Sequence, residues 1–159
     1  MQLYHASQIT NLSKIVPQPT LSHDKYIGDY VFATANFKLA LMYLVPKGIG
    51  ILMNVKANKP NIVIASNVKI LQSKDRGGAI YILSDEKFEK SPQQEIGEYE
   101  MVCKSEVKPI DKILYKSVLN ALTSNQIEVR FVSKSLFNEL INNPKQDQII
   151  KTIKPYQPK

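Results

Sequence analysis

Residues 2–7, QLYHAS, open the chain and decide how the fold is read. Such a short run, containing an aromatic residue and bounded by polar ones, predicts a first β-strand. The strand carries His5, flanked by Tyr4 and Ala6. Residues 8–29 follow, with two prolines and many polar residues, and predict a loop. Because loops of this length are uncommon in small domains and are often functional, the strand and its loop are the first candidates for a site.

The composition indicates one ordinary globular domain. A chain of 159 residues with 43% hydrophobic residues can bury a single core. No run approaches the roughly 18 apolar residues of a membrane span, which predicts no membrane partner. Cys103 is the only cysteine, and it lies in an apolar pattern, which predicts a buried structural thiol and suits a cytoplasmic location. With two histidines and no cysteine cluster, no metal site is expected.

The net charge of +7 comes from 19 lysines and only two arginines. Lysine is a hydrated point charge, whereas arginine gives the bidentate geometry that clamps phosphate. The lysines are dispersed along the chain, so the excess positive charge favours anionic partners without defining a nucleic-acid groove.

The remaining patterns predict an α+β domain of antiparallel strands with short helices around a compact core. Phe37, Ala40, Leu41 and Leu44 have helical spacing, so we expect a helix over 36–45 that Thr34 or Asn36 caps and that ends before Pro46. Two further helices are expected over 117–125 and 133–143, and residues 144–159 are expected to form a mobile tail after a single domain at 1–143. Strands are expected within 29–35, 48–57, 61–67, 77–84, 98–115 and 127–133.

Three segments occur in an order that resembles the ADP-ribosyltransferase-like family, in its branch with a histidine on the first core strand. They are LYHAS at 3–7, DYVFATANFKLALMYL at 29–44, and GAIYILSDEKF at 78–88 leading to GEYEMVCKSEVKPI at 97–110. The rifampin ADP-ribosyltransferases and many small bacterial proteins are similar in these segments. The resemblance covers residues 1 to about 110. It implies two small antiparallel sheets around an NAD cleft that short helices flank, with NAD as a substrate.

The resemblance also implies roles for individual residues. His5 matches the histidine that holds a hydroxyl of the nicotinamide-side ribose, with Ser7 as an additional hydroxyl, and a neutral imidazole offers the donor and acceptor that a ribose diol needs. Phe32 matches the ring that stacks on nicotinamide, where tyrosine is usual, and Tyr30 and Tyr43 lie nearby in the sequence. Read from periodicity alone, His5 is a hydrogen-bonded residue at a strand edge and Phe32 is a core residue.

An acidic residue is the third element that the resemblance implies, because a carboxylate stabilises the positive charge that develops on the ribose. Glu98 and Glu100 alternate on one strand face, and Glu100 is the better match. A pair of this kind also fits an exposed strand face. RNA 2′-phosphotransferase activity, found on the same fold, needs several arginines that this chain lacks.

These residues and patterns lead to two hypotheses of function. The first is an NAD-dependent mono-ADP-ribosyltransferase or NAD glycohydrolase whose acceptor, a protein or a nucleic acid, the sequence does not identify. The second is a non-catalytic module on the same fold that binds a protein or nucleic acid through its lysine-rich surface. A shared pocket for His5 and Glu100 favours the first hypothesis.

Overall fold

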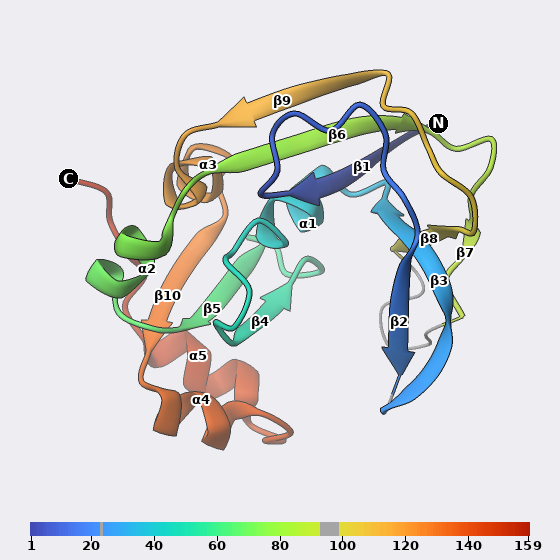
Figure 1. Ribbon diagram of the computed structural model, residues 1–159. Coiled ribbons are helices and arrows are strands. Elements are labelled where there is room, and N and C mark those ends of the chain that lie inside the picture. The colour runs from blue at the N-terminus through green and yellow to red at the C-terminus, as the bar shows by residue number, and fades with distance from the viewer. Residues whose placement is uncertain (23, 93–98) are drawn as a thin grey trace. The chain divides into compact units, whose positions relative to one another are not determined.

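A computed structural model describes residues 1–22, 24–92 and 99–159 as a small mixed α+β fold (Figure 1). The contacts within the chain divide it into two compact units, which we describe separately. Unit 1 comprises residues 1–44 and 78–115, and unit 2 comprises residues 45–77 and 116–159. None of the helices in the described ranges is long and apolar enough to cross a membrane.

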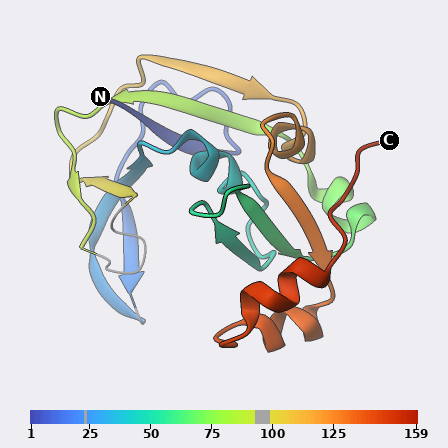
Figure 2. The ribbon, with the colours of Figure 1, turned by 180° about the vertical axis from the view of Figure 1, so that it is seen from behind.

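Unit 1 is built on a seven-stranded antiparallel sheet. Its main path runs β7-β8-β3-β1-β6-β9, and β2 pairs with β3 off this path (Figure 2). The expected strands at 2–7, 29–35, 77–84 and 98–115 are confirmed within this sheet. The strands are β1 (Gln2–Ser7), β2 (Gln18–Ser22), β3 (Lys25–Thr34), β6 (Gly78–Ser84), β7 (Glu89–Lys90), β8 (Glu100–Cys103) and β9 (Asp111–Tyr115).

The helix of unit 1, α1 (Phe37–Met42), confirms the helix expected over 36–45. The Asn36 side chain accepts a hydrogen bond from the Leu39 N–H and so caps the first turn. The Phe37 ring packs edge-on against Tyr4 of β1, with ring centroids 5.1 Å apart. This contact places α1 against the sheet face on which Tyr4 lies.

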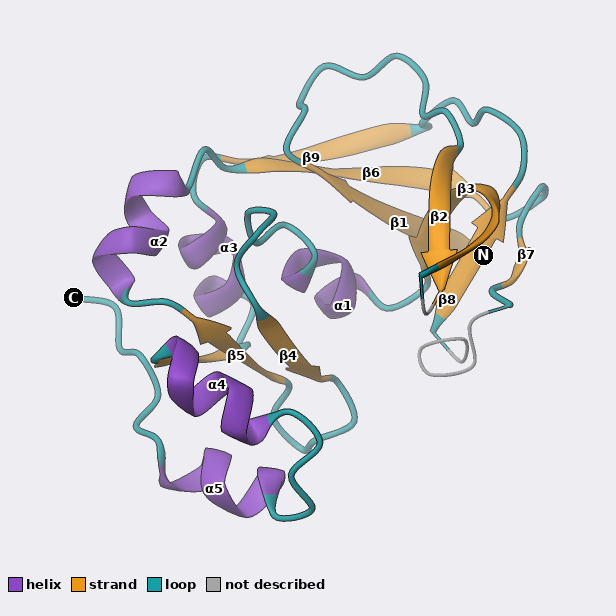
Figure 3. Ribbon diagram, turned by 60° about the horizontal axis from the view of Figure 1, so that its bottom comes forward, coloured by secondary structure: helices purple, strands orange, loops and turns teal. Residues whose placement is uncertain are grey.

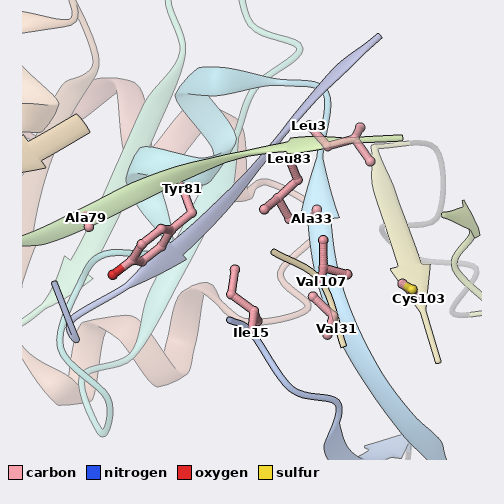
Figure 4. Packing of buried hydrophobic residues seen from close by; sticks show 9 residues of the cluster. All are labelled: Leu3, Ile15, Val31, Ala33, Ala79, Tyr81, Leu83, Cys103 and Val107. Carbon is pink, nitrogen blue, oxygen red and sulfur yellow. The ribbon is translucent and has the colours of Figure 1, made fainter. Parts of the chain in front are cut away.

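The opposite face of the unit 1 sheet carries a buried hydrophobic cluster (Figure 4). Residues from β1, β3, β6 and β8 share this face by the two-residue period of strands. Cys103 is among them and is only 2% exposed, which confirms the predicted buried thiol. Two loops close the cluster where Ile15 and Val107 exchange backbone hydrogen bonds. The buried members are Leu3, Ile15, Val31, Ala33, Ala79, Tyr81, Leu83, Cys103 and Val107.

Strands β1 and β3 pair at one point only, where Tyr4 is opposite Thr34. A continued antiparallel ladder would place Ala6 opposite Phe32, but no such pair forms. β3 instead pairs along its other side with β8, from Val31 to Thr34. The divergence of β1 from β3 opens the sheet beside His5.

Unit 2 contains a three-stranded sheet in the order β10-β5-β4 with four helices, shown in purple together with α1 in Figure 3. β5 and β4 are antiparallel, whereas β10 and β5 are parallel. The pairing of β10 with β5 is thus parallel and not antiparallel as expected. A parallel pair needs a long crossover connection, and the chain between β5 and β10 is long enough to supply it. The elements are β4 (Ile51–Asn54), β5 (Asn61–Ala65), α2 (Val68–Lys74), α3 (Val118–Ser124), β10 (Glu128–Val132), α4 (Lys134–Leu140) and α5 (Gln146–Thr152).

The segment 144–159, for which we expected a mobile tail, contains α5 in the structure. Ile150 is buried in a cluster with residues of α4, β5 and β10. Beyond α5, the Tyr156 N–H donates to the Val129 carbonyl at 2.7 Å, and the Tyr156 ring packs edge-on against Phe131. The apolar residues Ile149, Ile150 and Ile153, which are too few to pack alone, pack here against the rest of unit 2.

Candidate functional site

A cavity of about 420 Å³ lies in unit 1 where β1 and β3 diverge, and we call it the β1–β3 cavity. Its size falls in the range of about 300–1,000 Å³ typical of small-molecule sites. Side chains from β1, β2, β3, α1 and β8 line it, together with Tyr43, which directly follows α1. The lining residues are Tyr4, His5, Ala6, Thr20, Phe32, Ala33, Thr34, Ala40, Tyr43 and Glu100.

His5 lies at the point where the β1–β3 ladder stops. Its Nδ1 is 2.7 Å from the Phe32 carbonyl oxygen. Since a carbonyl can only accept, Nδ1–H is the donor, and in the neutral ring Nε2 then carries a lone pair. Burial lowers the pKa of His5, although the bond to Phe32 opposes this change. The imidazole therefore replaces a missing ladder bond and leaves one acceptor atom, Nε2, for a ligand hydroxyl.

Glu100 begins β8 and is opposite Thr34 of β3, and Thr34 is opposite Tyr4 of β1, so the sheet register places Glu100 level with the residue that precedes His5. The side chain is buried, with the residue only 7% exposed. Its Oε1 accepts a long hydrogen bond of 3.5 Å from the Tyr43 hydroxyl. Its Oε2 is buried and has no hydrogen-bond partner among the described residues. A buried carboxylate oxygen without a partner is costly, and the β1–β3 cavity is where a ligand donor would satisfy it.

The environment of Glu100 shifts the titration of its carboxyl group. Burial raises the pKa of its carboxyl, and hydrogen bonds from Ser91 and Tyr43 oppose this only in part. Burial and the nearby Glu100 charge also raise the pKa of Tyr43, so Tyr43 keeps its proton and remains a donor to Glu100. Perturbed titration in a cavity is typical of functional sites.

Two aromatic residues form part of the wall. Phe32 is half-buried on β3 and lines the cavity, so it does not belong to the buried core that periodicity favoured. Tyr43 lines the cavity with 38% of its surface exposed. Flat apolar faces of this kind suit a planar ring in the ligand.

Two other predicted contacts lie outside the lining. The Ser7 Oγ accepts from the Ile9 N–H and so forms the turn that follows β1. Tyr30 is buried, and its hydroxyl donates to the Ile27 carbonyl. Its ring lies over Gly28, where a Cβ would come within 2.9 Å of it. Glu98, the second candidate acid, lies outside the described residues.

Thr20 and Thr34 also line the cavity, although no sequence pattern marked them as site residues. Thr34 is 2% exposed, and its hydroxyl accepts from the Asn36 N–H, so it supports the start of α1. Its position two residues after Phe32 was a usable signal, because alternate residues share a strand face. Thr20 lies in β2, within a segment that gave no strand signal. The structure therefore brings together His5, Phe32, Tyr43 and Glu100, and leaves Ser7 and Tyr30 outside.

Metal ligands do not converge at this cavity. Within the ranges 1–22, 24–92 and 99–159, no group of three or more His, Cys, Asp or Glu side chains is placed to hold a metal ion. The acceptor atoms and aromatic rings that line the cavity suit hydroxyl groups and a planar ring instead.

Comparisons of the chain with protein-family models, with curated proteins and with solved structures found no match.

Proposed function

We propose that this protein has an ADP-ribosyltransferase-like fold and acts on NAD as a mono-ADP-ribosyltransferase or NAD glycohydrolase. The observation that carries the proposal is that His5 and Glu100, 95 residues apart in the sequence, line one cavity. A ribosyl site requires two polar groups of this kind. His5 provides a free acceptor atom, and Glu100 provides a buried oxygen without a partner in the described structure.

In this proposal, the ligand lies with its nicotinamide ring against Phe32 and Tyr43. His5 Nε2 accepts a hydrogen bond from a ribose hydroxyl, while the Nδ1–H bond to Phe32 fixes the ring. Glu100 Oε2 accepts from a second ribose hydroxyl and, in its ionised form, stabilises the positive charge that develops as nicotinamide leaves. Tyr43 holds Glu100 through Oε1 and so directs Oε2 to the ligand.

Histidine variants can separate binding from folding. Asn at position 5 can place an amide N–H near the Nδ1 position and keep the bond to the Phe32 carbonyl, but it lacks an atom equivalent to Nε2. We expect His5→Asn to fold and to bind NAD about fivefold more weakly in a calorimetric titration, which corresponds to the loss of one hydrogen bond of about 1 kcal/mol. Unchanged NAD affinity would contradict the role of Nε2.

Glu100→Gln tests catalysis. Its amide retains the size of the carboxyl group but carries no charge, so we expect the rate of nicotinamide release to fall about 10²–10³-fold with little change in NAD affinity. Glu89→Gln is the matched control, because Glu89 is exposed on β7 and forms only a 4.0 Å ion pair with Lys104. If the wild-type protein binds no NAD at millimolar concentration, the proposal fails and the lysine-rich binding module replaces it.

A further inference from the structure

The charge inside the β1–β3 cavity is unusual for a site that takes a dinucleotide. Among the described lining residues, Glu100 is the one acid, His5 is neutral, and no lysine or arginine is present, although the chain has 21 of them. The charge that the described lining residues supply is therefore that of one acid.

Phosphate groups need charged donors that the described side chains of this cavity do not offer. They are normally held by arginine or lysine, or by unsatisfied backbone N–H groups. The hydroxyl of Thr20 already donates to the Gln18 carbonyl. The Thr34 hydroxyl accepts from Asn36, and the Asn36 side chain caps the short helix α1. The described side chains of the walls thus offer the pyrophosphate of NAD no cationic partner inside the cavity.

The same walls match the other half of NAD. Nicotinamide attached to ribose is a planar cation, and cations are attracted to carboxylates and to the faces of aromatic rings. Phe32 and Tyr43 supply rings, and Glu100 supplies the carboxylate together with a buried oxygen that lacks a partner in the described structure. His5 Nε2 and Glu100 Oε2 are two acceptors for the two ribose hydroxyls.

We infer that the protein recognises the N-ribosylpyridinium group of its substrate, and that the adenosine diphosphate half of NAD contributes little to recognition. This inference rests on the proposed function. It predicts that nicotinamide riboside and nicotinamide mononucleotide are cleaved at the same bond as NAD and with similar kcat/KM.

The hydrolytic reaction is the same for all three compounds. The bond between ribose C1′ and the pyridinium nitrogen breaks, and its electron pair returns to the ring, so that nicotinamide leaves neutral. A water oxygen forms the new bond to C1′ and loses one proton to solvent. The unchanged part of the substrate, whether phosphate or adenosine diphosphate, remains on the ribose.

The test compares kcat/KM for NAD, nicotinamide mononucleotide and nicotinamide riboside, measured as nicotinamide release by the full chain. We expect the three values to lie within about tenfold of one another, and Glu100→Gln to lower all three about 10²–10³-fold while Glu89→Gln leaves them unchanged. We also expect kcat/KM for NAD to change less than threefold between 50 and 300 mM salt, because no lysine or arginine is among the described lining residues.

The outcomes separate this inference from the proposed function. If NAD is cleaved but kcat/KM for the riboside is a thousandfold lower, the inference is overturned and the proposed function stands. A steep fall of kcat/KM for NAD with rising salt has the same consequence. Failure of all three compounds to bind or react overturns both. Equal binding of NAD and the riboside without turnover supports the recognition and overturns the catalytic proposal.

Discussion

Hydrogen bonds to one buried hydroxyl, that of Tyr81, hold the loop that follows β1. Tyr81 lies on β6 opposite His5 and is fully buried. Its hydroxyl donates to the Ile9 carbonyl at 2.8 Å and accepts from the Leu12 N–H at 2.9 Å. Figure 4 shows this hydroxyl in the same view as the hydrophobic cluster of unit 1. We predict that Tyr81→Phe, which removes only one oxygen, weakens unit 1 and its cavity.

The magnitude follows from the two bonds. Each intramolecular hydrogen bond contributes about 0.5–1.5 kcal/mol net, so the loss of both costs about 1–3 kcal/mol. With a urea m-value of about 2 kcal/mol/M, the midpoint of urea unfolding falls by about 0.5–1.5 M. Because the freed segment adjoins His5 through β1, we also expect NAD binding to weaken in the variant.

The assay is urea unfolding followed by circular dichroism, with Tyr26→Phe as the matched control. Tyr26 is 64% exposed, and its hydroxyl bonds to the exposed Asp29, so the same chemical change there should leave the unfolding midpoint unchanged. If Tyr81→Phe unfolds within about 0.2 M urea of the wild type, the two hydrogen bonds do not hold the segment and the reasoning is refuted.

Three further predictions concern single residues. Burial raises the pKa of folded Glu100 above its ordinary value of 4.5, so the folded state binds the proton more tightly, and wild-type stability falls as the pH rises from 4.5 through the folded pKa. Glu100→Gln lacks this loss, so its stability relative to the wild type should increase between pH 4 and pH 8 in parallel urea titrations; a constant difference would show that the carboxyl is not perturbed. Phe32→Ala should weaken NAD binding at least tenfold by calorimetry while Phe32→Tyr retains it, because only the former removes the aromatic face; equal affinities would exclude stacking. In unit 2, Asp75 accepts from the Ser117 hydroxyl and from the Val118 and Leu119 N–H groups at the start of α3, so Asp75→Ala should cost about 1–2 kcal/mol and speed amide hydrogen exchange in α3, with unchanged exchange as the contrary result.

Local signals predicted most of the regular structure. The spacing of Phe37, Ala40 and Leu41 with a capping Asn36 gave α1, because one apolar stripe and one cap suffice to define a helix. The same signals missed α2, in which Leu71 is the only buried residue and Ile70 is exposed, so no apolar stripe exists. They also missed β2, where Pro19 is tolerated because the strand lies off the main path of the sheet.

The site was predictable only in part, since it depends on register between distant strands. The pairs Tyr4 with Thr34 and Thr34 with Glu100 bring β1, β3 and β8 together at one level of the sheet. No local pattern specifies these pairs. Nor does any local pattern show that β1 and β3 diverge and that the His5 ring bonds to the Phe32 carbonyl in place of the ladder.

The most direct test of the central claim is the ¹⁵N NMR spectrum of the imidazole groups during a titration with NAD. The chain has two histidines, and a His23→Gln variant assigns the signals of His5. The account predicts a neutral ring protonated at Nδ1 in the free protein, and a shift of the Nε2 resonance of His5 on NAD addition as a ribose hydroxyl donates to it. An Nε2 resonance that does not move at 10 mM NAD would contradict an NAD site in the β1–β3 cavity.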